Sequence, residues 1–390
     1  SASIMASLEK MGFETDDRLG YADIYVLNTC AVTREAERKS RQLVTRVRRF
    51  NPAAHVFVCG CASQKNAEPF KEKGVDFVCG ASEKQQVLEQ IALLINKTPC
   101  GLLPPKQTKT RAFVKIQDGC NNFCSYCIIP YLRGREVSRP ISEIVEEIQN
   151  TPCPEVVLNG INISSYSDRG AGLAALIGAL GGVDKRLRLG SLECGIIDNE
   201  LLTALKNLPD FAQQFHLSLQ SGSNAVLKAM NRHYTRGEYL EKCALIYKYF
   251  PDAAITTDII SGFAAESEED FGQTLSIIEE AGFARVHAFS YSPREGTNAY
   301  KLKDLPPDVK TERLHRLICA GRKAELSYIN KFLGKPLSFI AECCDGEYTE
   351  GYSGNYIKVY VKGVLEISKK YTVTLTEIFK DGAMGTAQKA

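Results

Sequence analysis

The chain has 390 residues, too many for one ordinary domain, so two or three domains are expected. Hydrophobic residues make up 44% of it and charged residues 24%, the proportions of a globular protein with real cores. With 48 Lys and Arg residues against 46 Asp and Glu residues, the net charge is +2, which neither demands nor excludes a nucleic-acid partner. No apolar run is long enough to span a membrane, and no secretory signal opens the chain.

The chain contains fourteen cysteines. They are not spaced as even pairs in a small loop-rich domain, so a secreted disulfide scaffold is excluded. A reducing cytoplasm is the expected compartment. Many thiols in that compartment indicate metal binding, catalysis or simple burial.

The first 100 residues alternate strand and helix patterns. Apolar, β-branched runs that stop at polar turns are typical of buried parallel strands, and they occur at 21–28, 54–59 and 75–79. Residues 33–50 are predicted to be a helix with Thr33 as its N-cap. This alternation predicts a parallel α/β domain over 1–100. Residues 101–111, rich in Pro, Lys and Thr, are predicted to be a linker.

The alternation restarts at residue 112 and extends to residue 334. Strands are predicted at 112–117, 155–159, 186–191, 214–219, 254–260 and 284–290. Helices are predicted at 141–150, 171–180, 198–207, 235–249, 267–281 and 308–332. Six strand–helix units predict a partial (β/α)6 barrel rather than a complete eight-unit barrel.

Residues 335–390 change character. Short alternating runs punctuated by glycine, at 337–343, 356–361 and 371–378, predict a small antiparallel β-barrel of the kind that often binds nucleic acid. The last dozen residues have no apolar period and are predicted to be frayed.

Three thiols fall within eight residues after the first strand of the central domain: Cys120, Cys124 and Cys127. Three thiolates can hold three corners of a [4Fe–4S] cluster and leave one iron open, as a chemical role requires. A structural zinc site is the rival interpretation. Zinc needs a fourth ligand, however, and neither Cys100 nor Cys153 lies at the usual spacing.

The segment Cys120–Arg139 (CNNFCSYCIIPYLRGREVSR), with an aromatic residue at Tyr126, resembles the radical S-adenosylmethionine (SAM) methylthiotransferases. The resemblance covers essentially the whole chain. It implies an N-terminal α/β domain with a second [4Fe–4S] cluster, a partial barrel with the SAM cluster, and a small β-barrel, called TRAM, that binds RNA. In that family cleavage of SAM yields a 5′-deoxyadenosyl radical, and a second SAM supplies the methyl group.

The N-terminal cluster of that family has three cysteine ligands. Two match here, Cys30 in Asn-Thr-Cys and Cys61 in Gly-Cys-Ala-Ser-Gln, and both follow predicted strands. The third lies before the point where this chain starts, so we expect an incomplete second cluster. Cys59, which alternates with Cys61, and Cys79 are expected to be buried small hydrophobic residues.

Polar residues lie at the predicted carboxyl ends of the barrel strands, where barrel enzymes place their working groups. The resemblance implies that these positions bind SAM or line the substrate mouth: Asn159, Ser191, Glu193, Gln220 and Asp258, together with Tyr126 of the cysteine segment. His216 and His233 could be ligands or bases, although core or surface histidines are commoner. The family's usual Gly-Phe-Pro-Gly-Glu becomes Gly-Phe-Ala-Ala-Glu at 262–266, which predicts a less rigid loop.

Cations suggest RNA contacts. Arg133, Arg135 and Arg139 follow the cluster loop beside Tyr131, which suits phosphate contact and base stacking. Seven cations crowd the predicted helix 33–50, where a solvated helix face is about as frequent as RNA binding.

Within the family, the segments Cys120–Cys124 and His216–Gly222 resemble most the branch that methylthiolates C2 of N6-threonylcarbamoyladenosine beside the tRNA anticodon, at position 37. The alternatives are N6-isopentenyladenosine in tRNA, an aspartate of a ribosomal protein, and a non-catalytic zinc-stabilised RNA-binding protein. The expected partners are a tRNA anticodon stem-loop and an electron donor such as a flavodoxin. A monomer without membrane attachment is expected.

Overall fold

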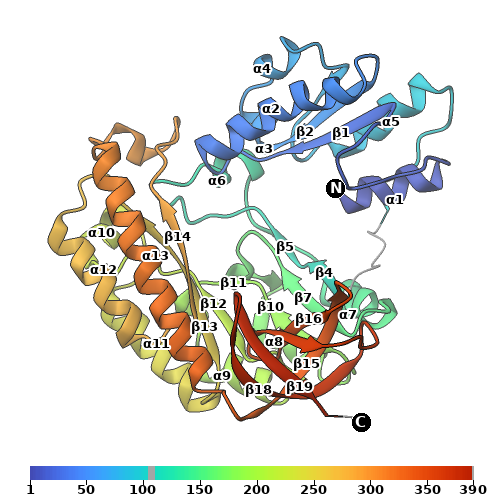
Figure 1. The fold of residues 1–390 in the computed structure, drawn as a ribbon. Helices are drawn as coiled ribbons and strands as arrows, with labels where there is room; N and C mark the ends of the chain where they lie inside the picture. The colour runs from blue at the N-terminus through green and yellow to red at the C-terminus, as the bar shows by residue number, and fades with distance from the viewer. Residues whose placement is uncertain (104–109, 389–390) are drawn as a thin grey trace. The chain divides into compact units, whose positions relative to one another are not determined.

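The computed structural model describes residues 1–103 and 110–388 (Figure 1). It forms two compact units. The first contains the described part of Ser1–Lys106 with Cys120–Arg135 and Ser292–Lys301, and the second contains the remaining described residues. Of the predicted linker 101–111, residues 104–109 lie outside the described residues. The domain limits at 100, 112 and 334 remain a prediction.

The first unit is built on a parallel sheet with the strand order β1 (Ile24–Thr29), β2 (His55–Gly60), β3 (Phe77–Val78). Helix α2 (Arg34–Phe50) covers one face, and α1 (Ala2–Lys10) and α5 (Lys84–Leu94) cover the other. The unit also contains α3 (Cys61–Lys65), α4 (Glu68–Lys71) and α6 (Ile129–Arg133). The predicted parallel α/β arrangement is confirmed, and Thr33 caps α2 by accepting from the Ala36 N–H.

The second unit contains the predicted partial barrel. One parallel sheet has the order β10 (Arg186–Leu189), β7 (Glu155–Asn159), β4 (Arg111–Lys115). The next has the order β11 (Ser191–Leu192), β12 (Gln214–Leu217), β13 (Ala254–Ser261), β14 (Arg285–Ser290). Only Gly190 separates β10 from β11, and a Cβ there would lie 3.0 Å from the Leu158 carbonyl oxygen. The third predicted strand therefore steps from one sheet to the other at a glycine.

Helices alternate with these strands and cover their outer face (Figure 1). They are α7 (Ile141–Asn150), α8 (Leu173–Ala179), α9 (Asn199–Lys206), α10 (Asn224–Ala229), α11 (Arg236–Tyr249), α12 (Glu268–Glu280) and α13 (Pro307–Asn330). Two short antiparallel pairs, β5 (Gln117–Asp118) with β6 (Val137–Ser138) and β8 (Ser167–Asp168) with β9 (Ala171–Gly172), complete the unit.

The C-terminal segment is a closed five-stranded barrel, as predicted, and all its strand pairs are antiparallel except β17 with β19, which is parallel. Its order is β15 (Pro336–Cys344), β16 (Tyr348–Ser353), β17 (Lys358–Lys362), β19 (Gly382–Ala387), β18 (Lys370–Phe379). The prediction that the last dozen residues are frayed is wrong for β19. Its first residue must be glycine, because a Cβ on Gly382 would lie 2.1 Å from the Lys358 carbonyl oxygen, and four of the other five residues are also small. Its sequence therefore lacks the β-branched alternation that marks most strands.

The C-terminal barrel shares a hydrophobic core with the partial barrel. Tyr328 and Phe332, at the end of α13 and just after it, pack with Phe339 and Val373 of the C-terminal strands. Ion pairs continue the contact, since Lys370 lies 2.5 Å from Asp210. The two barrels therefore bury apolar surface together.

Gly351 of β16 lies where two strands of the C-terminal barrel approach each other closely. A Cβ on Gly351 would lie 1.9 Å from the Ile340 carbonyl oxygen, so Gly351→Ala forces two backbones apart. We expect a loss of about 2 kcal/mol of unfolding free energy and a melting temperature lower by several degrees, measured by circular dichroism. Gly354→Ala is the control, because its Cβ would meet only the Arg186 guanidinium at 4.0 Å. Equal melting temperatures for the two variants would contradict the prediction.

Candidate active site

The loop that carries Cys120, Cys124 and Cys127 folds back on itself. The Cys120 N–H donates to the Gly134 carbonyl at 3.2 Å, and the Cys127 N–H donates to the Cys124 carbonyl at 2.9 Å. Phe123 adopts φ +47°, an unusual conformation for a bulky residue. Strained backbone of this kind is common at functional sites, where the surrounding structure holds it in place.

This cysteine loop rests on the core of the first unit. Ile128 and Leu132, in and before α6, pack with Val44 and Phe70 of the N-terminal domain. The Ala299 N–H donates to the Ser125 carbonyl at 2.7 Å. Cys124 is buried, and Cys120 and Cys127 are partly exposed. Three thiols on one anchored loop fit a [4Fe–4S] cluster that keeps one iron open.

Cys30 and Cys61 follow neighbouring parallel strands. Thr29 and Gly60, the residues before them, pair directly in the β1–β2 register, so both thiols start from the same sheet edge. Gly60 has φ +113°, and a Cβ there would lie 2.4 Å from the Thr29 carbonyl oxygen. Cys30 is exposed and Cys61 partly exposed, whereas Cys59 and Cys79 are buried as predicted.

Glu37 of α2 ties the first unit together. Its carboxylate lies 2.5 Å from Arg294, 3.0 Å from Arg41 and 3.4 Å from Lys65. Lys65 ends the helix that Cys61 begins, and Glu37 lies in the first turns of the helix that follows Cys30. Burial alone would raise the pKa of Glu37, but the hydrogen bond from Arg294 and the charges of Lys65 and Arg294 lower it below its usual range.

We predict that Glu37→Gln destabilises the chain by about 2 kcal/mol at pH 7, because the charged hydrogen bonds are lost. Since the folded-state pKa of Glu37 is depressed, its stabilisation is present above the unfolded pKa and lost as pH falls through the folded pKa. Urea unfolding at pH 7, 5 and 3 should therefore show the difference from the wild type shrinking. Glu35→Gln, which breaks exposed pairs with Arg38 and Lys39, should have a small effect at every pH. A Glu37→Gln deficit that stays constant with pH would contradict this assignment.

Four predicted cofactor residues lie at one edge of the partial barrel. Asn159 ends β7, and its buried Oδ1 has no hydrogen-bond partner within the described residues. Glu193 pairs with Arg232 at 2.9 Å, and Ser191 is exposed on β11. Gln220 has φ +72° and is pinned to β13 by its N–H, which donates to the Asp258 carbonyl at 2.8 Å. An orphaned amide oxygen beside these groups fits a polar ligand such as SAM.

The other predicted residues lie elsewhere. Tyr126 belongs to the first unit, with Arg133 and Arg135, whose guanidinium lies 4.8 Å from the Phe123 ring. Arg139 belongs to the second unit, where it donates to Glu147 at 2.7 Å and to the Lys115 carbonyl at 2.9 Å. Both bonds are made by Nη1, so other N–H groups of the guanidinium remain for a phosphate contact. RNA contact by the three arginines stays a prediction.

Asp258 lies on the inner face of the sheet with two histidines. The side-chain ligand atoms of His216, Asp258 and His287 all lie within 4.8 Å of one another. Sequence reasoning gave His216 little weight and did not single out His287. The sequence signal that could have identified both histidines is the occurrence of polar residues at alternate positions of otherwise apolar strands.

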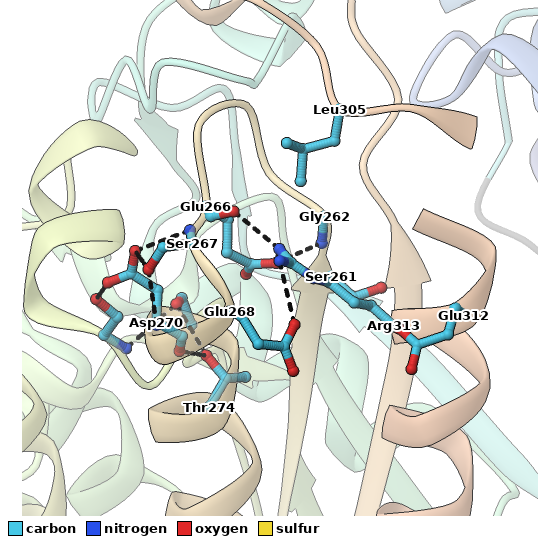
Figure 2. A network of polar contacts seen from close by, with 12 residues as sticks. Ser261, Gly262, Glu266, Ser267, Glu268, Asp270, Thr274, Leu305, Glu312 and Arg313 are labelled. Carbon is cyan, nitrogen blue, oxygen red and sulfur yellow. Dashed lines mark hydrogen bonds and ion pairs between the residues drawn. The ribbon is translucent and has the colours of Figure 1, made fainter. Parts of the chain in front are cut away.

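The loop 262–266 closes over the end of β13 (Figure 2). Arg313 of α13 reaches across to Glu266, with its Nη1 2.8 Å from Oε2, and the Gly262 N–H donates to the same oxygen at 2.9 Å. Burial raises the pKa of Glu266 despite these donors. Ala265, where the family has glycine, adopts φ +64°. The loop is thus anchored at its last residue, and its predicted lower rigidity stays a prediction.

Ala265→Gly should stabilise the chain by up to about 1 kcal/mol. A left-handed alanine costs roughly 1–2 kcal/mol, and the added entropy of an unfolded glycine offsets part of the gain. Ala264→Gly is the matched control, since Ala264 has no positive φ and should lose stability. Thermal unfolding of both variants measures the difference, and a loss in Ala265→Gly as large as that in Ala264→Gly would refute the strain.

Comparisons with known proteins agree on one family. The family model described as "Radical SAM superfamily" matches residues 114–278, and the model described as "Uncharacterized protein family UPF0004" matches residues 1–80. The threonylcarbamoyladenosine tRNA methylthiotransferase MtaB of Chlamydia pneumoniae is 38% identical over 93% of this chain and 89% of its own. MtaB of Bacillus subtilis is 34% identical over 97% and 90%. The tRNA-2-methylthio-N(6)-dimethylallyladenosine synthase of Thermoanaerobacter sp. is 36% identical over 88% and 79%.

Solved structures support the fold. The radical SAM methyltransferase TsrM of Kitasatospora setae matches with a TM-score of 0.54 and 13% identity, over 75% of this chain and 73% of its own. At that identity the likeness concerns the fold alone. Among the described residues no helix has the length and apolar character needed to span a membrane.

Proposed function

This chain belongs to the radical SAM tRNA methylthiotransferase family, and we propose that it adds a methylthio group to C2 of N6-threonylcarbamoyladenosine at position 37 of tRNA. The observation that carries the proposal is the near full-length similarity to proteins named for that reaction, at up to 38% identity. Relatives named for dimethylallyladenosine reach 36% identity, so that base is the second candidate. The segments Cys120–Cys124 and His216–Gly222 favour the first.

The cysteines divide between two proposed clusters. Cys120, Cys124 and Cys127 hold the [4Fe–4S] cluster that binds SAM, and Cys30 and Cys61 supply two ligands of a second [4Fe–4S] cluster. When bound, the first cluster and SAM supply the 5′-deoxyadenosyl radical, and the protein positions the groups. Asn159, Ser191, Glu193 and Gln220 orient SAM by hydrogen bonds at the strand ends, with Tyr126 beside the third cysteine.

The proposed partner is the anticodon stem-loop of tRNA. Arg133 and Arg135 lie in the same unit as the cysteine loop and offer guanidinium groups for phosphates. A small redox protein such as a flavodoxin would deliver electrons, and the proposed compartment is the cytoplasm, with the chain acting as a monomer.

Expression in a bacterial strain that lacks its own tRNA methylthiotransferases tests the proposal. Its tRNA contains both unmethylthiolated bases, and nucleoside mass spectrometry separates the products. We expect 2-methylthio-N6-threonylcarbamoyladenosine to appear. The dimethylallyl product alone would assign the second candidate base, and the absence of both products would contradict a role in tRNA methylthiolation.

Cys124→Ala should abolish SAM cleavage, because two thiols cannot hold the cluster that keeps an iron open for SAM. The measurement is 5′-deoxyadenosine formation by the reconstituted chain under anaerobic reduction. Circular dichroism should show an unchanged fold, since the loop is anchored by Ile128 and Leu132. Cys319→Ala, an exposed thiol on α13, is the control and should cleave SAM normally. Undiminished cleavage in Cys124→Ala would remove these cysteines from the mechanism.

A further inference from the structure

The inner face of the partial barrel carries a cluster of three polar residues, which we call the inner trio: His216, Asp258 and His287. They come from the adjacent strands β12, β13 and β14, where Asp258 pairs with His287 in the register. Their sequence neighbours, including Phe215 and Ile259, lie in the core beneath the helices. Because side chains alternate along a strand, the trio faces the opposite side, into the barrel.

A chain of hydrogen bonds fixes the orientation of His216. Gln214 Nε2 donates to Thr256 Oγ1 at 3.0 Å, and that hydroxyl lies 3.0 Å from His216 Nδ1. The hydroxyl can donate its own hydrogen to Nδ1, an arrangement that makes Nε2 the protonated nitrogen. His216 Nε2 lies 3.3 Å from Asp258 Oδ2. The Asp258 carboxylate is held in place and can accept a further hydrogen bond.

Both ring nitrogens of His216 have a polar neighbour, Thr256 at Nδ1 and Asp258 at Nε2. His287 is different, because its ring nitrogens have no hydrogen-bond partner among the described residues, and its ring centre lies 5.6 Å from that of His216. Burial lowers the pKa of His287, outweighing the nearby Asp258, so the ring is neutral near pH 7 and can donate one hydrogen bond.

The residues around the trio indicate which class of ligand it binds. Toward the amino ends of the strands, Thr256 and Arg285 line a small cavity with Tyr356 and Lys358 of the C-terminal barrel, and Arg285 is paired with Glu325 at 2.5 Å. Toward the carboxyl ends lies Phe289, two residues after His287 on the same face and 46% exposed. An exposed ring beside one acceptor and one donor fits a flat heterocycle that stacks and is read at its edge.

We propose that the inner trio and Phe289 bind the target adenine, with Asp258 accepting its exocyclic N–H, His287 donating to a neighbouring ring nitrogen and Phe289 stacking on the ring. The proposal rests on the proposed function, since it names the part of the site that takes the base. It moves Asp258 from SAM binding to recognition of the RNA base. His216 acts as a positioning residue that holds Asp258.

Paired RNA probes test the N–H contact directly. Synthetic anticodon stem-loops carry either N6-methyladenosine or N6,N6-dimethyladenosine at position 37, which differ by the N–H that Asp258 would accept. The reconstituted full-length chain with SAM should bind the first about tenfold more tightly than the second, as one well-placed base contact permits. Asp258→Asn should lose most of this discrimination. Asp252→Asn, an exposed aspartate in the turn before β13, should keep it.

A second measurement distinguishes a role of the trio in binding the base from a role in binding SAM. Asp258→Asn and His287→Ala should lower kcat/KM for methylthiolation of tRNA at least tenfold more than they lower 5′-deoxyadenosine formation without RNA. His287→Gln, which can still donate, should recover part of the loss, and exposed His233→Gln should behave as the wild type. A parallel fall in RNA-independent SAM cleavage would assign the trio to SAM and overturn the proposal, as would undiminished base discrimination. A wild type that modifies no tRNA would instead contradict the proposed function.

Discussion

Parallel strand pairing is the constraint on which most of this structure depends. In a parallel sheet every strand delivers its carboxyl end to the same edge, so residues far apart in sequence meet there. In the first unit this brings Cys30 and Cys61 to neighbouring strand ends. In the second unit it collects Asn159, Glu193 and Gln220 at one edge of the partial barrel, with the inner trio one layer below. The parallel sheets therefore position the candidate site residues, and the helices pack against the sheets and stabilise them.

Close backbone approach is the second requirement. The turn that places Cys61 passes so near Thr29 that only glycine fits at position 60, and Gly190 lets the third barrel strand step between sheets. Gly351 and Gly382 do the same in the C-terminal barrel, which closes beneath the partial barrel with a common core. In each case the glycine is needed because of its neighbour in space rather than its neighbours in sequence.

Ion pairs with little access to water connect segments that lie far apart in the sequence. Glu37 links the helices that flank Cys30 and Cys61 to Arg294, which lies more than two hundred residues away. Glu266 and Arg313 anchor the loop after β13 in the same manner (Figure 2). Removing one partner of such a pair leaves a charge with little access to water, so these contacts matter more than exposed pairs.

Local sequence was sufficient to predict several features of this protein. The apolar runs predicted the strands of the parallel sheets to within a few residues. The spacing of Cys120, Cys124 and Cys127 indicated an iron–sulfur cluster, and both patterns are local. Strand β19, the Glu37–Arg294 pair and the position of His287 beside Asp258 were not predictable in this way. Each depends on a partner distant in the chain: β19 on the closeness of β17, Glu37 on a cation of another segment, and His287 on the side of the sheet that the helices leave uncovered. Periodicity identifies which residues can face a core, and only the tertiary fold decides which polar residues meet inside it.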